Sequence, residues 1–132
     1  MFMENSKFFY GYASVFREKD LNGDVVLPES FVEKFLNPKT IPLFFEHNPR
    51  KKIGKITNIK QNNKGLYIEG FIENSFIPEK AKLSKKIPLS IGYIPHFQLK
   101  SKNGNRYISN IMLLEVSLVK KSANKLAYGI LV

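Results

Sequence analysis

The sequence predicts a mainly β (α+β) fold, a closed or nearly closed β-barrel with two or more short peripheral helices. Segments rich in β-branched and aromatic residues recur through the 132-residue chain, at the spacing of about 8–12 residues that is typical of sandwiches and barrels. Only two short segments favour a helix. Closure of the sheet would also pair the edges that such apolar strands otherwise expose to solvent.

The predicted strands are separated by residues that favour turns. The first predicted strand is residues 8–16, which are rich in aromatic and β-branched side chains. Residues 53–60 and 66–73 flank Asn62-Asn63-Lys64-Gly65, which predicts a hairpin. Turns are also predicted at residues 20–24 and 102–105. The remaining predicted strands are residues 41–46, 87–94, 107–119 and 126–132.

Two segments are predicted to be short helices. Residues 28–36 begin with proline, which suits the first position of a helix, and end before Pro38. Residues 78–86 are predicted to form the second helix, which is amphipathic.

Length and composition indicate one soluble globular domain, residues 1–132. Hydrophobic residues make up 43% and charged residues 24% of the chain, an ordinary balance for a folded protein. The absence of cysteine excludes disulfides, thiolate metal sites and a cysteine nucleophile, and it suits a reducing compartment. Residues 1–7 lack the apolar core of a signal peptide, and no run approaches the roughly 18 apolar residues of a membrane span. We therefore expect a cytoplasmic protein that contacts no membrane.

The net charge of +10 favours a polyanionic partner, either nucleic acid or an acidic protein surface. The basic residues are spread along the chain, and only residues 50–52, 85–86 and 120–121 cluster. Such small clusters are more typical of solvated charge than of a nucleic-acid groove. The aromatic residues at positions 8, 9, 10 and 12 resemble a stacking platform for bases, but at strand spacing they more often belong to a core.

Histidine occurs only twice, at His47 and His96. His47 follows an apolar strand and precedes a polar loop that contains Pro49, a common place to present a catalytic group. An ordinary surface histidine is the alternative. His96 lies among apolar neighbours, and we expect it to serve packing.

Ser90 and Glu115 are polar residues within apolar predicted strands. Alternation places Ser90 on the same face as Gly92, where the missing side chain would leave space for a substrate backbone. The absence of a Gly-x-Ser-x-Gly motif excludes an α/β-hydrolase elbow. Glu115 must either face solvent or find a partner inside, because burial of an unpaired carboxylate is costly. A histidine that it orients would be such a partner. From these residues alone, both alternatives stay open.

No metal site or cofactor is predicted. Asp20, Asn22 and Asp24 are spaced like the start of an EF-hand loop, but Val25 and Phe31 stand where that loop needs glycine and glutamate. No cluster of histidine and carboxylate residues has the spacing of a zinc site.

An ordered series of short segments spans residues 11–127 and includes IPLFFEH at 41–47, LSIGY at 89–93 and LEVSLV at 114–119. The other segments are residues 11–16, residues 20–28 with Phe31, residues 53–56 and residues 65–70. Taken together they resemble the caudovirus (tailed-phage) prohead serine protease family, which is similar to the herpesvirus assemblin proteases. Asn48 departs from the aspartate that commonly follows the histidine in this family, and Ser122-Ala123-Asn124-Lys125 departs from its Pro-Ala-Asn-Pro-like tail.

The resemblance implies a serine endopeptidase with an assemblin-like barrel. Its nucleophile would be Ser90, its base His47 and the third member of its triad Glu115, with backbone oxyanion donors near Ala123 and Asn124. It further implies cleavage of scaffold segments of the capsid protein, and of the enzyme itself, inside immature phage proheads in the bacterial cytoplasm. Homodimers also occur among such enzymes, and no cofactor is involved.

Two other functions are compatible with the sequence. One is a non-catalytic basic β-barrel that binds single-stranded nucleic acid. Its binding would depend steeply on salt and would not change when Ser90 is substituted. The chain could also be a phage structural module that keeps the fold without activity, which would not react with a serine-directed phosphonate.

Overall fold

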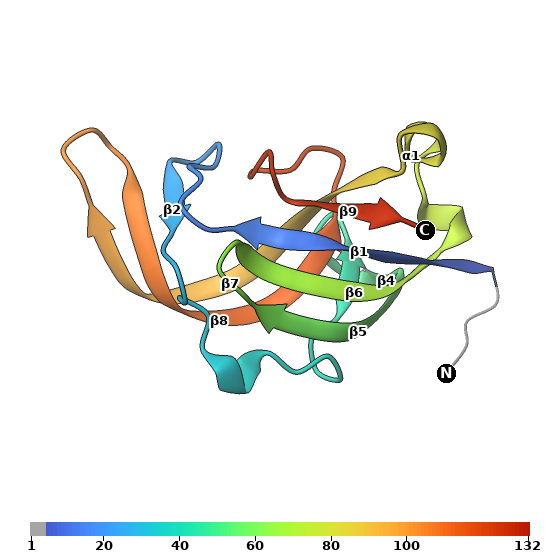
Figure 1. The fold of residues 1–132 in the computed structure, drawn as a ribbon, viewed down its shortest axis with the longest axis horizontal. Helices are drawn as coiled ribbons and strands as arrows, with labels where there is room; N and C mark the ends of the chain where they lie inside the picture. The colour runs from blue at the N-terminus through green and yellow to red at the C-terminus, as the bar shows by residue number, and fades with distance from the viewer. Residues whose placement is uncertain (1–4) are drawn as a thin grey trace.

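A computed structural model describes residues 5–132 as a strongly curved sheet with few short helices (Figure 1). The expectation that residues 1–7 form no signal peptide falls partly on residues 1–4, which lie outside the described residues. The strands are β1 (Ser6–Val15), β2 (Asp24–Val26), β3 (Leu43–Phe45), β4 (Asn48–Lys52), β5 (Gly54–Gln61), β6 (Gly65–Glu73), β7 (Lys86–Lys100), β8 (Arg106–Leu118) and β9 (Tyr128–Leu131). The helices are α1 (Glu79–Ser84) and two 3-10 turns, η1 (Glu33–Phe35) and η2 (Asn74–Phe76). Within this part of the chain, no helix combines the length and the apolar character that a membrane crossing requires.

The strands form one mixed sheet in the order β4-β3-β8-β7-β9-β1-β6-β5, with β2 paired to β8 outside this path. β2 and β3 run parallel to β8, and the other ladders are antiparallel. The mainly β prediction is confirmed, but the sheet is not found closed into a barrel, because the order ends at β4 and β5. Ile53 alone separates these two end strands: its N–H donates to the Leu43 carbonyl (3.1 Å) and its carbonyl accepts from the Glu73 N–H (2.8 Å).

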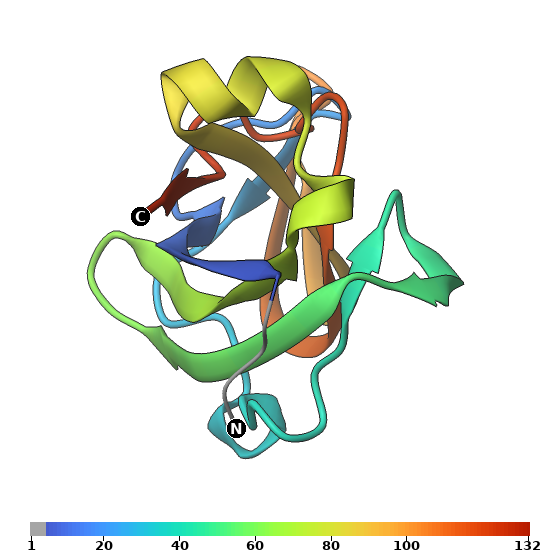
Figure 2. The same ribbon diagram turned by 90° about the vertical axis from the view of Figure 1, so that its right-hand side faces the viewer.

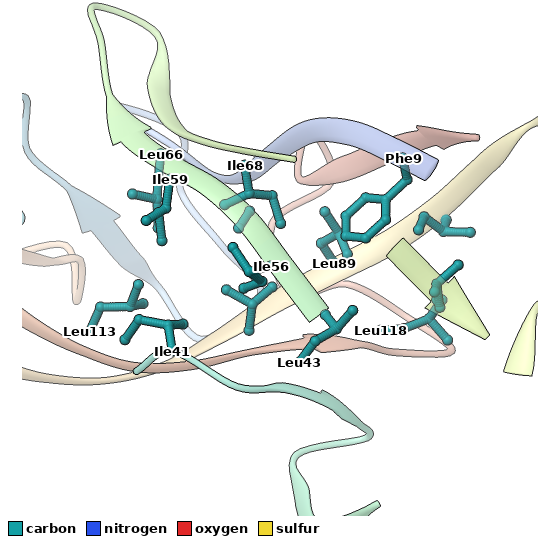
Figure 3. Packing of buried hydrophobic residues seen from close by; sticks show 14 of the residues in the cluster. Phe9, Ile41, Leu43, Ile56, Ile59, Leu66, Ile68, Leu89, Leu113 and Leu118 are labelled. Carbon is teal, nitrogen blue, oxygen red and sulfur yellow. The ribbon is translucent and has the colours of Figure 1, made fainter. Parts of the chain in front are cut away.

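Aliphatic side chains fill the inside of the curved sheet (Figure 3). β6 alternates buried and half-buried residues, so that Leu66, Ile68 and Ile72 are fully buried. Burial of each such side chain contributes about 1.5–3 kcal/mol relative to exposure. On β7 and β8, Leu89 and Val116 also point into this core. Because strand residues alternate between faces, the residues beside them on the chain lie on the opposite face of the sheet.

Most predicted strands are confirmed, and so are the hairpin between β5 and β6 and the helix near residues 78–86. The predicted helix at residues 28–36 is wrong: only η1 is helical there. Phe31 instead forms a parallel bridge with Ile111, and the Val32 N–H donates to the Ile111 carbonyl. Because this segment pairs with β8 in an extended conformation, the tertiary contacts override its local preference for a helix.

The residues after His47 form a strand rather than the expected loop. β4 (Asn48–Lys52) is polar and exposed, and therefore lacks the alternation from which strands are recognised. It pairs with β3 to make a hairpin that projects beside the sheet (Figure 2).

Candidate active site

His47 lies in the turn of the β3–β4 hairpin. Phe45 pairs with Asn48, so Glu46 and His47 are the only two turn residues, with φ angles of 51° and 60°. Two-residue hairpin turns with positive φ at both positions usually carry Asn-Gly, because other side chains are strained in this region by about 1–2 kcal/mol each. Strain of this kind is found where a site requires a particular backbone geometry.

Hydrogen bonds to β8 and to the segment that follows it hold the strained turn. The Glu46 N–H donates to the Leu118 carbonyl (2.9 Å), and the His47 N–H donates to the Ser117 hydroxyl (3.0 Å). The Glu46 carboxylate also accepts a hydrogen bond from the Lys120 N–H. These contacts fix the position of His47 relative to the end of β8.

The imidazole of His47 contacts the carboxylate of Glu115, with 2.5 Å between Nδ1 and Oε2. The His47 side chain is 43% exposed and the Glu115 side chain only 12%, so the ring covers the carboxylate from solvent. Where a neutral imidazole contacts a carboxylate through Nδ1, Nδ1 is the donor and Nε2 is the acceptor. Of the two alternatives for Glu115, the inward partner is therefore observed.

Ser117 completes this arrangement and was not identified from the sequence. Its hydroxyl donates to the second oxygen of Glu115 (2.7 Å) while accepting from the His47 N–H, and the residue is fully buried. A closed ring of contacts thus joins the His47 backbone, Ser117, Glu115 and the His47 side chain. The i, i+2 spacing of Glu115 and Ser117 along a strand is the sequence signal that could have indicated it.

Gly92 provides the space that Glu115 occupies. The two residues face each other in the β7–β8 ladder, and a Cβ on Gly92 would lie 2.4 Å from Oε2 of Glu115. We expected this gap to admit a substrate backbone, and that expectation is wrong because the carboxylate fills it. The glycine instead allows Glu115 to reach His47.

Ser90 lies opposite Ser117 in the same ladder and lines a cavity of about 290 Å³ together with His47. Within the described part of the chain, the Ser90 hydroxyl makes no hydrogen bond. Catalytic hydrogen bonds are often long in unliganded enzymes and shorten when substrate binds.

Ala123 and Asn124 line the same cavity, on the loop between β8 and β9. Ser122 anchors this loop through a hydrogen bond to the Leu89 carbonyl (2.7 Å), and the Asn124 amide donates to the Val15 carbonyl (3.2 Å). The Ala123 carbonyl accepts from the Leu21 N–H (2.9 Å). Among residues 5–132, the N–H groups of Ala123 and Asn124 have no acceptor, so they are available to a ligand.

Asp20, Asp24 and Tyr93 also line the cavity. Asp24 is buried and paired with Arg106 through two hydrogen bonds of 2.8 Å. Burial, together with the negative charge of Asp24, raises the pKa of Tyr93 to about 12. Burial likewise raises the pKa of Asp20, whose carboxylate accepts hydrogen bonds from the N–H groups of Asn22 and Asp24 and so stabilises its own turn.

His96 is exposed on β7 and does not line the cavity. The expectation that it serves packing is wrong, because the neighbouring β7 residues of this arm are also mostly exposed. Among the described residues, no group of three or more histidine, cysteine, aspartate or glutamate side chains could hold a metal ion.

Three comparisons relate this chain to known proteins. A family model described as "Caudovirus prohead serine protease" matches residues 2–128. The "Prohead protease" of Enterobacteria phage HK97 is 38% identical over 64 residues, which are 47% of this chain and 28% of that protein. The chain therefore spans well under half the length of this curated relative.

Two solved structures share the fold. KSHV protease in complex with a hexapeptide phosphonate inhibitor matches with a TM-score of 0.65 at 16% identity, over 96% of this chain and 65% of that one. Varicella-zoster virus protease matches with a TM-score of 0.51 at 14% identity, over 86% and 57% of the two chains. These likenesses confirm the expected assemblin-like fold.

Gly92→Ala should separate His47 from Glu115. The added Cβ would displace the carboxylate, so the neutral ring should lose its preference for the Nδ1–H tautomer. Long-range ¹H–¹⁵N spectra of the imidazole report the tautomer directly. Gly104→Ala, in the distant β7–β8 turn, is the control for a destabilising glycine substitution: its Cβ meets nothing within 4 Å, but the φ of 89° strains an alanine, so it should lower stability without changing the tautomer. An unchanged tautomer in the Gly92 variant would contradict the role of this glycine.

Proposed function

Because the chain belongs to the caudovirus prohead serine protease family, we propose that it is the catalytic domain of a serine endopeptidase. Ser90 is the nucleophile, His47 the base and Glu115 the residue that orients His47. The observation that carries the proposal is the His47–Glu115 contact of 2.5 Å beside a cavity that Ser90 also lines. That contact occupies Nδ1 and leaves Nε2 as the ring's acceptor.

The reaction follows from this arrangement. A serine hydroxyl is a poor nucleophile until a base removes its proton, and Nε2 of His47 takes the proton of Ser90 as the oxygen attacks the scissile carbonyl. Glu115 stabilises the imidazolium that forms. The imidazolium then protonates the leaving amine, and water hydrolyses the acyl-enzyme by the same steps. This chemistry requires no metal and no cofactor.

The N–H groups of Ala123 and Asn124 are the proposed oxyanion donors. They line the same cavity as Ser90, and neither has an acceptor among residues 5–132. Preorganised N–H donors stabilise the negative oxygen of the tetrahedral intermediate, and one such donor is worth about 10²–10³ in turnover. The hydrogen bonds of Ser122 and of the Asn124 side chain keep the loop in place for this task.

The proposed substrate is the scaffold segment of a phage capsid protein, and the enzyme is expected to cleave itself as well. The family description and the name of the HK97 relative support this assignment. On this proposal residues 1–132 act as a single domain inside immature proheads in the host cytoplasm, as a monomer or a homodimer, without a membrane or nucleic-acid partner.

Ser90→Ala should abolish cleavage of a co-expressed capsid-protein precursor of the same phage. Loss of a serine nucleophile costs on the order of 10⁶ in turnover. His47→Asn should have a similarly severe effect, and asparagine suits the positive φ of the turn. Gel analysis of the precursor measures both.

His96→Asn is the matched control for His47→Asn, since His96 lies outside the cavity. It should leave cleavage at the wild-type rate. Loss of cleavage in the His96 variant, with normal cleavage in the His47 variant at equal stability, would show that the base is assigned to the wrong histidine.

Glu115→Gln should retain measurable activity, lower by about 10²–10⁴ than wild type. The carboxylate orients the imidazole and makes no bond to the substrate, so its loss is less severe than loss of the nucleophile. Single-turnover cleavage assays with purified protein measure the difference. Cleavage at the wild-type rate would mean that the contact with His47 has no catalytic role.

A further inference from the structure

A second groove adjoins the catalytic cavity and is lined by lysines. Its volume is about 690 Å³, and its lining includes Lys80, Lys86, Lys121 and Lys125 but, within residues 5–132, no carboxylate residue. Its remaining surface is largely apolar and includes Pro88, Ala127 and Tyr128. We call this feature the lysine groove.

The four lysines are available to an anionic ligand. All four are exposed, and among the described residues none of them lies within 4.0 Å of a carboxylate oxygen. Lys86 holds its ammonium group over the ring of Tyr128, 4.7 Å from the centroid. The groove therefore combines unpaired positive charge with an apolar floor.

Lys121 lines both the lysine groove and the catalytic cavity, so the two lie side by side. Pro88 also lines the groove, and it lies only two residues before Ser90 on β7. A polypeptide that reaches Ser90 can thus extend into the groove.

The sign of the charge reverses between the two spaces. Among the described residues, three carboxylates without an ion-pair partner line the catalytic cavity: Glu18, Asp20 and Glu46. Asp24 also lines it, but Arg106 neutralises its charge, and Lys121 is the one cationic residue described in that lining. Acidic substrate residues would be repelled there and attracted in the lysine groove. The charge pattern therefore specifies where along a substrate an acidic stretch fits.

We propose that the lysine groove binds an acidic segment of the polypeptide substrate, a few residues from the bond that Ser90 attacks. This inference rests on the proposed protease function and adds a substrate class to it. The groove suits a peptide better than single-stranded nucleic acid, because Lys86 already covers a face of the Tyr128 ring on which a base would stack. In the part of the chain that the structure describes, Tyr128 is the only aromatic residue that lines the groove.

Binding of a fluorescein-labelled oligoglutamate peptide to the Ser90→Ala protein tests the groove without requiring catalysis. Lys80→Glu with Lys125→Glu should weaken binding roughly tenfold, because two attractive charges become repulsive. Lys39→Glu with Lys102→Glu changes the net charge equally at exposed positions that do not line the groove, and should change binding by less than about twofold. Thermal unfolding verifies that both variants fold. If the reversal variant does not fold, Lys80→Gln with Lys125→Gln takes its place, with an expected loss of about threefold.

Equal losses in the groove and control variants, or no loss in either, would overturn the proposal, since binding would then reflect overall charge alone. Tighter binding of a labelled oligothymidylate than of oligoglutamate, lost in the same groove variant, would assign the groove to nucleic acid instead.

Cleavage assays distinguish a wrong protease assignment from a wrong assignment of the groove. With Ser90 intact, the groove variant should cleave the co-expressed precursor more slowly than wild type but still to completion, unlike Ser90→Ala. Normal cleavage by the groove variant would contradict a role in substrate capture. Absence of cleavage by wild type would refute the protease function, and the oligoglutamate measurement would still decide whether the groove binds acidic peptide.

Discussion

The hydrogen bond between Nδ1 of His47 and Glu115 is the contact on which the rest of the site depends. It joins the turn of the β3–β4 hairpin to β8 near its C-terminal end, so it requires a defined position for both. Gly92 leaves the space in which the carboxylate lies, and Ser117 holds the second carboxylate oxygen and the His47 backbone together. Because Nδ1 donates to Glu115, Nε2 is the ring nitrogen that can accept the proton of Ser90.

The fold supplies this position through its core. Leu89, Val116 and Leu118 are buried, and the strand alternation that buries them presents Ser90, Glu115 and Ser117 on the other face. The strained turn at Glu46 and His47 is then tied to the end of β8 by the hydrogen bonds that its two N–H groups donate to the Leu118 carbonyl and the Ser117 hydroxyl. The contacts to β8 offset the cost of two positive φ angles, which a free hairpin with these residues would not sustain.

The sequence singled out His47, Ser90 and Glu115 as candidates but did not predict how they are arranged. His47 at the end of an apolar strand, and polar residues within the strands of Ser90 and Glu115, were visible because local pattern reveals them. The roles of Gly92 and Ser117 were not, because they follow from the register of β7 against β8, which local pattern does not fix. The same limit explains the wrong helix at residues 28–36 and the missed strand β4: long-range pairing with β8 and β3 determines both.

The central claim is that His47 activates Ser90, and covalent labelling tests it most directly. The account predicts that an alkyl fluorophosphonate, a reagent that needs an activated serine but no substrate sequence, forms one adduct. Peptide mapping by mass spectrometry should place it on Ser90, and the labelling rate should fall sharply in His47→Asn. Labelling of another serine, or labelling of Ser90 at the same rate without His47, would contradict the account.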